Sequence, residues 1–336
     1  MEIEAAAARI SGEVWRTPML ASRTAARLIE DRYGVALGSG PAADGAPRLF
    51  VKAEHLQVTG SFKPRGAVNK IAELTAEERS RGLIALSAGN HAQAVAYAAS
   101  GQGIPAAVVM PAGASLAKAA AAAGYGAEVI LHGDTVGAAL AHLQELRDQR
   151  GLVYIPPFDD PAIIAGQGTV GLEILADLPE VDVVVVGIGG GGLISGTAAA
   201  LRQRRPSVRV YGVEPEGSNA MSLALAAGHV VTLDPASIAD GLGAPFAGLW
   251  TLDLVRRYVE RVVLVQDAEI AAGMRFALER MKQLLEPAGA AALAAILAGR
   301  IPLRPGDTVC AVASGGNVDL SRLPDLLALA EAVDWW

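Results

Sequence analysis

Residues 181–196 read Val-Asp-Val-Val-Val-Val-Gly-Ile-Gly-Gly-Gly-Gly-Leu-Ile-Ser-Gly, which is a short apolar strand, a glycine turn and the start of a helix. A short, nearly continuous apolar run is typical of a strand that helices cover on both faces of a parallel sheet. Consecutive glycines at 189–192 let backbone N–H groups converge on an anion, and the helix start adds a partial positive charge. The turn therefore predicts a phosphate cradle at the end of a parallel strand.

The same turn also fits a different cofactor. It matches the pattern GxGxxG from Gly187 to Gly192, and Glu214 ends the next predicted strand. In dinucleotide-binding proteins an acidic residue about 20 residues beyond the glycines binds the ribose. Here Glu214 lies 27 residues after Gly187 (214 − 187), and four consecutive glycines exceed what a dinucleotide turn needs. Both features argue against a dinucleotide, but a single glycine motif is weak evidence. A nicotinamide-dependent oxidoreductase therefore remains an alternative at this point.

Strands and helices alternate along most of the chain in the same way, as in parallel sheets covered by helices. We therefore predict an α/β protein with two open, twisted, mostly parallel sheet domains, the smaller inserted in the larger. The smaller domain is predicted at residues 80–158 and the larger at 1–79 and 159–336. We expect no regulatory domain, because only a short helical tail follows about residue 320. The predicted strands are 49–54, 83–87, 106–110, 128–131, 181–186, 208–213 and 309–313.

The composition narrows the class of ligand. The chain has 336 residues, of which 52% are hydrophobic, and a formal net charge of −7. Charges of both signs are scattered, so there is no basic stripe for a nucleic-acid backbone. No apolar run approaches the ~18 residues of a membrane span, and the N-terminus lacks the pattern of a signal peptide. We expect a cytoplasmic protein that binds a small molecule, with no nucleic-acid or membrane partner.

Lys63 lies in a second strand-to-helix turn, Thr59-Gly-Ser-Phe-Lys-Pro-Arg-Gly-Ala67. The chain has only five lysines against 23 arginines, so a lysine in such a turn suggests a chemical role. A lysine amine can lose its proton and attack a carbonyl group, which a guanidinium cannot do. For a lone lysine, an exposed turn residue is the ordinary explanation.

Two further turns follow predicted strands, Ser87-Ala-Gly-Asn-His91 and Ser314-Gly-Gly-Asn317. The first offers N–H groups at a helix start, which suit a substrate carboxylate, and Asn90 can bond a ring oxygen. Taken singly, each turn is explained by helix capping or by the freedom of glycine. All four turns would open on one sheet edge, where α/β folds bind ligands. An amine, an anion clamp, a phosphate cradle and a neutral hydroxyl are what a phosphorylated aldehyde cofactor needs.

In their amino-acid sequences and in their order along the chain, these turns and several further segments resemble the threonine/serine dehydratase family of fold type II pyridoxal-phosphate-dependent enzymes. That family belongs to the superfamily of the tryptophan synthase β chain. Each motif alone is weak, but the set is specific to the family and covers nearly the whole chain. The matching segments are residues 59–67, 87–93, 157–161, 164–169, 189–196, 212–215, 286–290 and 314–317.

The resemblance implies a role for each matching position. Lys63 corresponds to the catalytic lysine that forms the Schiff base with pyridoxal 5'-phosphate, and Phe62 and Asn90 to neighbours of the cofactor ring. Gly189, Gly190, Gly191 and Gly192 correspond to the phosphate loop, and Ser314 to the partner of the pyridine nitrogen. Ser87, Ala88, Gly89, Asn90 and His91 correspond to the loop that binds the substrate carboxylate, and Glu286 to a carboxylate that faces the active site.

The implied activity is β-elimination from a β-hydroxy amino acid such as L-threonine or L-serine, which gives a 2-oxo acid and ammonia. The other activities of the fold stay open: racemisation, β-replacement, and dehydration of a bulkier β-hydroxy amino acid. Family members that racemise serine carry a serine where this chain has Ala88, and β-replacement synthases usually have aspartate where it has Pro64. A ligand-binding module without catalysis would keep the cradle and tolerate loss of Lys63.

The resemblance also implies partners. The family often binds a divalent cation through the glutamate at Glu214 and an acidic residue a few positions later, but residues 217–221 contain no carboxylate. A hard cation takes several oxygen ligands, so a complete divalent or monovalent cation site is doubtful here. We expect a homodimer that acts on an amino acid.

Overall fold

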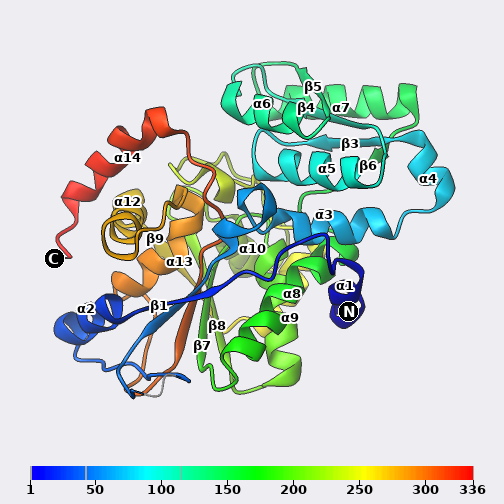
Figure 1. Ribbon diagram of the computed structural model, residues 1–336. Helices are drawn as coiled ribbons and strands as arrows, with labels where there is room; N and C mark the ends of the chain where they lie inside the picture. Colours follow the sequence, from blue (N-terminus) through cyan, green and yellow to red (C-terminus); the bar gives the residue numbers. More distant parts are fainter. Residues whose placement is uncertain (1, 42–43, 115, 336) are drawn as a thin grey trace.

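Helices and strands alternate around two sheets in the computed structural model, which describes residues 2–41, 44–114 and 116–335 (Figure 1). The larger sheet has six strands in the order β1-β2-β10-β7-β8-β9. Its only antiparallel pair among the described strands is β1 with β2; all other pairs are parallel. The strands are β1 (Met19–Ser22), β2 (Leu49–Lys52), β7 (Val183–Gly187), β8 (Arg209–Pro215), β9 (Arg261–Val265) and β10 (Val309–Val312).

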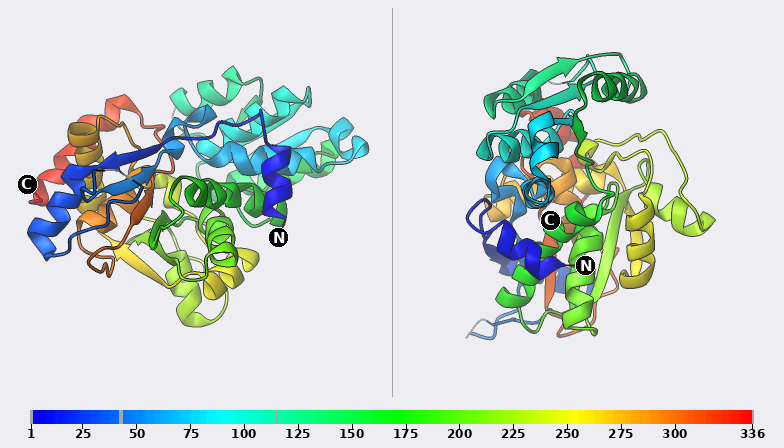
Figure 2. Two further views of the ribbon diagram at one scale, coloured as in Figure 1. Left: turned by 60° about the horizontal axis from the view of Figure 1, so that its bottom comes forward. Right: turned by 90° about the vertical axis from the view of Figure 1, so that its right-hand side faces the viewer.

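The second sheet is parallel throughout and has the strand order β5-β4-β3-β6. All four strands come from residues 83–154, which we call the small unit; the rest of the chain is the large unit. Figure 2 shows the small unit set to one side of the six-stranded sheet. The elements are β3 (Leu83–Leu86), α5 (Asn90–Gly101), β4 (Ala106–Met110), α6 (Leu116–Gly124), β5 (Glu128–Leu131), α7 (Val136–Arg150) and β6 (Val153–Tyr154). The predicted fold class is confirmed, whereas the domain boundaries stay a prediction.

Helices cover both faces of the six-stranded sheet, because successive side chains of a strand point to opposite faces. In β7, Val183 and Val185 pack with α2, α12 and α13, while Val184 and Val186 pack with α8 and α9 on the other face. This explains why the strand reads as a continuous apolar run. The helices of the large unit are α1 (Ile3–Arg9), α2 (Arg23–Tyr33), α3 (Lys63–Ala72), α4 (Ala76–Arg81), α8 (Pro161–Asp177), α9 (Gly192–Arg204), α10 (Ala220–Ala227), α11 (Leu249–Tyr258), α12 (Asp267–Phe276), α13 (Pro287–Leu297) and α14 (Leu323–Leu329).

Helix α3 lies between the two units, since its Val68 and Ile71 share a buried cluster with Leu83 of β3 and Ile163 of α8. The first residue of α3 is Lys63, and α5, α9 and α13 begin at Asn90, Gly192 and Pro287. The four helix starts therefore belong to the turns singled out in the sequence or adjoin them. No helix in the described ranges is long and apolar enough to cross a membrane.

Candidate active site

The turn that carries Lys63 is held against the turn that follows β10. The Phe62 amide donates to the Ser314 carbonyl at 3.1 Å, and Ser61 forms a β-bridge with Gly315. The backbone of Gly60 is left-handed (φ +75°), and a Cβ there would lie 2.4 Å from Oδ1 of Asn317. A glycine is therefore needed at position 60 for both conformation and space. These contacts join two turns that are about 250 residues apart in sequence, as parallel strands β2 and β10 allow.

The Lys63 amine has a neutral hydrogen-bond partner. Its Nζ donates to the Pro157 carbonyl at 2.9 Å and lies 5.2 Å from the centre of the Phe62 ring. Burial lowers the pKa of Lys63 to about 8, against an opposing effect of Glu286. Among the described residues Lys63 forms no ion pair, so the site leaves its amine able to lose a proton near neutral pH.

The glycine turn presents unused backbone donors. In the part of the chain that the structure describes, the amides of Gly189, Gly190, Gly191 and Gly192 have no hydrogen-bond acceptor. The last three glycines are buried, and Gly191 has a left-handed backbone (φ +95°) as the N-cap of α9. Buried amides normally have partners, so three buried amides and a half-buried fourth without acceptors among the described residues fit a phosphate bound at this helix start.

The segment after the small unit connects Lys63 to this turn. Pro157 accepts the hydrogen bond from Lys63, and Phe158 packs so closely on the glycines that a Cβ at Gly190 would lie 2.3 Å from its ring. A Cβ at Gly192 would lie 3.1 Å from Phe158. The amine and the phosphate cradle are therefore neighbours across Pro157 and Phe158. Sequence reasoning did not assign a role to these two residues, although both lie in a segment that carries the family resemblance.

The turn between β3 and α5 is shaped by its own polar groups. The Gly89 amide donates to Oγ of Ser87 at 3.1 Å, and the amides of Asn90 and His91 have no acceptor among the described residues. The Nε2 of His91 donates to the Ile155 carbonyl at 2.9 Å. Burial and then Lys63 lower the pKa of His91 to about 3, which keeps the ring neutral. The free amides, rather than the His91 ring, can receive a carboxylate.

Asn90 and Glu286 meet across the two units. Nδ2 of Asn90 donates to Oε1 of Glu286 at 2.6 Å, while Nδ2 of Asn317 donates to Oδ1 of Asn90 at 2.8 Å. Burial raises the pKa of Glu286 to about 7, Asp240 raises it further, and the Asn90 hydrogen bond lowers it. The structure thus brings together Asn90 and Glu286 as neighbours, and it adds Asn317. Asn317 ends the Ser-Gly-Gly-Asn segment, so the sequence contained a signal for it.

Ser314 offers a hydroxyl without charge at the end of β10. It is buried, and its Oγ lies 3.4 Å from the Ala288 carbonyl at the start of α13. A hydroxyl at this place can donate a hydrogen bond to a neutral pyridine nitrogen. Because the hydroxyl carries no negative charge, it does not favour protonation of that nitrogen. The amine, the free amides and this hydroxyl together fit pyridoxal phosphate.

Glu214, near the end of β8, accepts hydrogen bonds from residues of α10. Its Oε1 accepts from the Met221 amide at 2.7 Å, and its Oε2 accepts from the amide and the hydroxyl of Ser222 at 2.9 and 2.6 Å. Burial raises the pKa of this carboxyl group. The described residues contain no cluster of three or more His, Cys, Asp or Glu side chains that could hold a metal ion.

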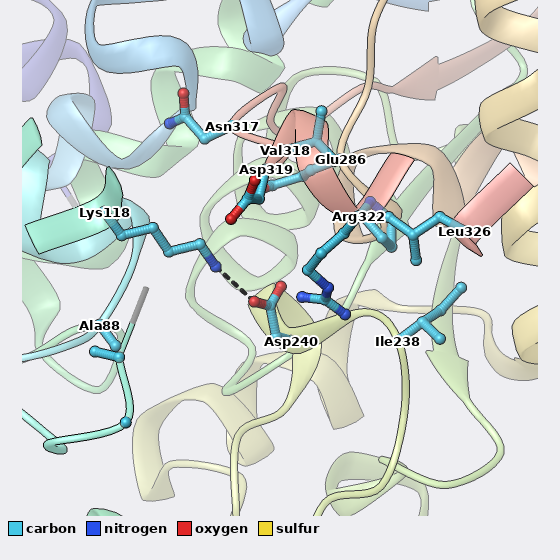
Figure 3. Close-up of a pocket in the computed structure, with 13 residues that line it drawn as sticks. Ala88, Lys118, Ile238, Asp240, Glu286, Asn317, Val318, Asp319, Arg322 and Leu326 are labelled. Carbon is cyan, nitrogen blue, oxygen red and sulfur yellow. Dashed lines mark hydrogen bonds and ion pairs between the residues drawn. The ribbon is translucent and has the colours of Figure 1, made fainter. Parts of the chain in front are cut away.

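A cavity of about 340 Å³ begins at Ala88, Glu286 and Asn317 and runs outward between the two units. Figure 3 shows the residues that line it, among which Lys118 of α6 points toward Asp240 of the large unit. Their Nζ and Oδ2 atoms are 2.5 Å apart. The cavity leads from the candidate site to the surface and can admit an amino acid. Neither Lys118 nor Asp240 was identified from the sequence, because their contact depends on how the two units meet.

Comparisons with known proteins give a consistent result. Residues 10–315 match the family described as pyridoxal-phosphate dependent enzyme. The chain is 44% identical over 287 residues to the L-threonine dehydratase catabolic TdcB of Escherichia coli strain K12, covering 84% of this chain and 87% of that protein. The structure of maize serine racemase is similar with a TM-score of 0.87 at 37% identity, covering 97% and 95% of the two chains. The processed form of threonine deaminase isoform 2 from Solanum lycopersicum has a TM-score of 0.87 at 34% identity, covering 98% and 88%.

Proposed function

Because the chain belongs to the family of pyridoxal-phosphate dependent enzymes, we propose that it is a lyase that converts a β-hydroxy amino acid, such as L-threonine or L-serine, to a 2-oxo acid and ammonia. The family, fold and cofactor expected from the motifs are confirmed. A nicotinamide cofactor, the alternative for the glycine turn, is not supported. The observation that carries the proposal is the position of the Lys63 amine. It is partly buried, it is hydrogen-bonded to the neutral carbonyl of Pro157, and it lies near the amides of Gly189–Gly192, which have no acceptor among the described residues.

The substrate is held by its carboxylate. We assign this to the start of α5, where the amides of Asn90 and His91 are free and the helix end adds a partial positive charge. Ala88 lines the same cavity and Glu286 lies beside Asn90, so the remainder of the amino acid would extend past these residues. The neutral His91 ring then acts only as a support for the turn, through its hydrogen bond to Ile155.

Lys63 acts as the base. Bound pyridoxal phosphate supplies a conjugated ring that takes up the electron pair left when the α-proton departs. With a pKa near 8, the Lys63 amine is neutral in roughly a tenth of the molecules at pH 7 and in about half at pH 8, and the neutral amine can accept this proton. Ser314 would face the pyridine nitrogen of the cofactor with an uncharged hydroxyl. Without a negative charge there the ring is a milder electron sink, which favours loss of a β-hydroxyl over a long-lived carbanion.

The proposal is tested with the purified protein and pyridoxal phosphate. We expect visible absorbance from the bound cofactor and release of ammonia and a 2-oxo acid from L-threonine or L-serine. Lys63→Ala should lose both the absorbance and at least about a thousandfold of the activity, the loss typical when a base and nucleophile is removed. Lys282→Gln, at an exposed lysine, is the matched control and should retain both. A colourless protein that pyridoxal phosphate cannot restore would overturn the proposal.

Racemisation is the second candidate, since maize serine racemase is among the similar structures. A racemase needs a proton-transferring group on each face of the α-carbon, and the methyl group of Ala88 can neither donate nor accept a proton. We therefore expect L-serine to yield pyruvate and ammonia without D-serine. Chiral chromatography of the products distinguishes the two reactions, and a panel of β-hydroxy amino acids identifies the preferred side chain.

We keep four further proposals. Residues 80–158 form a domain inserted in the larger one, the protein is a cytoplasmic homodimer, and the site residues have the roles given above.

The fourth proposal concerns a divalent or monovalent cation at Glu214. This carboxylate already accepts three hydrogen bonds, which supports the view that no complete cation site exists there. Light scattering and metal analysis of the purified protein test the oligomeric state and the metal content.

A further inference from the structure

Within the described ranges, one ion pair connects the two units, at the mouth of the cavity. Among the ion pairs of the described residues, Lys118–Asp240 is the one that connects residues 83–154 with the rest of the chain; the pairs of His142, Arg147 and Arg150 stay inside the small unit. The side chain of Lys118 is 21% exposed and that of Asp240 is 47% exposed. Figure 3 shows Lys118 and Asp240 lining the same cavity as Glu286 and Asn317.

The helix that carries Lys118 is coupled to the candidate carboxylate-binding turn. Ala119 of α6 and Ala88 of the turn pack against the same buried cluster, which includes Ala92 of α5 and Met110 of β4. A movement of α6 toward Asp240 would therefore move the turn with it, because packed interiors transmit displacement. Asp240, in turn, adjoins Gly241, where a Cβ would lie 3.7 Å from Oε1 of Glu286. Both ends of the ion pair are thus tied to groups that face the substrate.

We propose that the Lys118–Asp240 ion pair holds the small unit closed over the cavity and so positions the Ser87–His91 turn around the carboxylate of the bound amino acid. The two residues are positioning residues, and they act through the turn rather than on the reacting atoms. The proposal rests on the proposed function in that the cavity receives an amino acid.

The expected effect is on affinity. Partly exposed ion pairs contribute modestly, so Lys118→Met should raise the KM for L-threonine about two- to fivefold and leave kcat within about twofold. Asp240→Asn should do the same, and the double variant should be no worse than either single one. Lys118→Arg keeps the charge and should restore the affinity. Glu128→Gln breaks the exposed Arg150–Glu128 pair inside the small unit and should leave KM unchanged.

The dependence of KM on salt concentration distinguishes a closing ion pair from a merely structural role of Lys118 and Asp240. The KM of the wild type should rise toward that of Lys118→Met as the ionic strength approaches 1 M, where the Debye length falls to about 3 Å. The KM of Lys118→Met should depend much less on salt. Additive effects of Lys118→Met and Asp240→Asn, or equal salt dependence in the two proteins, would overturn the proposal.

A binding measurement makes the outcome independent of turnover. L-Alanine has no β-leaving group, and its dissociation constant follows from the change that it causes in the visible absorbance of the holoenzyme. We expect it to bind Lys118→Met about two- to fivefold more weakly than the wild type. If L-threonine is not converted but this difference is found, the proposed function fails and the closing contact stands. Equal affinity for L-alanine in both proteins refutes the closing contact whatever the activity.

Discussion

Lys63 and Glu286 have opposite pKa shifts with one main cause. Burial disfavours the charged form of each, which lowers the pKa of Lys63 to about 8 and raises that of Glu286 to about 7. Each of the two side chains also favours the charged form of the other, because their charges are opposite. The site therefore holds a base and an acid whose protonation changes near neutral pH, as acid–base catalysis requires.

The first prediction concerns the dependence of activity on pH. Lys63 accepts a proton only when neutral, so kcat for L-threonine should rise with pH through about 8 and then level off. Glu286→Gln removes the carboxylate that favours charged Lys63, so the rise should move to lower pH. Initial rates of 2-oxo acid formation between pH 6 and 9 in both proteins provide the measurement. A rate that is flat across this range would contradict the assignment of Lys63 as the base.

The second prediction concerns Gly190. An added Cβ would lie 2.3 Å from the Phe158 ring, so Gly190→Ala must displace either the ring or the turn whose amides are free. Overpacking of this kind typically costs about 1–3 kcal/mol, and we expect the affinity for pyridoxal phosphate to fall roughly 10- to 100-fold. Titration of the cofactor-free protein with pyridoxal phosphate gives the affinity.

Two further variants control this experiment. The double variant Gly190→Ala with Phe158→Leu provides space and should recover part of the affinity. Gly137→Ala, in α7, meets only the Thr135 hydroxyl at 3.8 Å and should bind the cofactor like the wild type. Unchanged cofactor affinity in Gly190→Ala would show that the turn does not hold the phosphate.

At the scale of elements, a buried ionic network fixes the start of α3. Arg65, two residues after Lys63, donates from Nε and Nη2 to the two carboxylate oxygens of Glu54, each at 2.8 Å. Its Nη1 also donates to Glu173 of α8 at 2.7 Å, and Lys52 of β2 lies 2.6 Å from the same carboxylate. The network therefore joins β2, α3 and α8, and it limits where the Lys63 amine can lie.

The third prediction follows from this network. Glu54→Gln removes one of the two carboxylates that pair with the buried Arg65. Because Glu173 still compensates the Arg65 charge, we expect the loss of stability to lie at the lower end of the about 3–5 kcal/mol that an uncompensated buried charge typically costs. Urea denaturation monitored by circular dichroism gives the change in the free energy of unfolding. Glu4→Gln breaks the exposed Arg204–Glu4 pair and should change it by about 1 kcal/mol or less. Similar small losses in both variants would argue against a structural role of the network.

The same variant predicts a pH effect on stability. Burial alone would raise the pKa of Glu54, but Arg65 and Thr17 hold it below its ordinary value of 4.5. A carboxyl group whose folded pKa is lowered stabilises the protein above its unfolded pKa and loses this contribution as the pH falls through the folded value. The wild type should therefore lose stability more steeply below about pH 4.5 than Glu54→Gln does. Urea midpoints measured from pH 3 to 7 test this, and parallel curves would contradict it.

The sequence predicted these elements to different degrees. The inner strands β2, β3, β4, β7, β8 and β10 and the edge strand β5 contain apolar runs, and all seven were predicted within three residues of their observed ends. The strands not predicted lie at sheet edges: β1 is four residues long, β6 is two, and β9 begins at the exposed Arg261. At these three edges the sequence lacks the apolar pattern on both faces that makes an inner strand recognisable.

The site shows the same limit. The polar-glycine turns could be identified because each has its own local chemistry. Three of them follow β2, β7 and β10 of the six-stranded sheet, whereas Ser87–His91 follows β3 of the other sheet, so the expectation of one shared sheet edge was wrong for this turn. The contacts of Asn90 with Glu286 and of Lys118 with Asp240 span 196 and 122 residues. No local pattern encodes such pairs; they depend on the relative placement of the two units.

At the scale of the whole molecule, the candidate site is shared between the units. The start of α5 belongs to the small unit, while Lys63, the glycine turn and Ser314 belong to the large one. A ligand that contacts both must stabilise their association as well as the fold of each, because binding to the native state alone shifts the folding equilibrium. Cofactor binding is thus expected to order the interface between the units.

The last prediction tests this coupling. Pyridoxal phosphate at about 100 times its dissociation constant should add about 2.7 kcal/mol of stability and raise the Tm by about 5 °C in scanning calorimetry. In hydrogen-exchange mass spectrometry, the cofactor should slow exchange at the start of α9, where the free amides of Gly189–Gly192 lie, and also at the start of α5 across the cavity. Lys63→Ala should show a smaller Tm rise and weaker protection at both places. Protection confined to α9 would mean that the cofactor engages the large unit alone, and that Asn90 contributes to the substrate rather than to the cofactor.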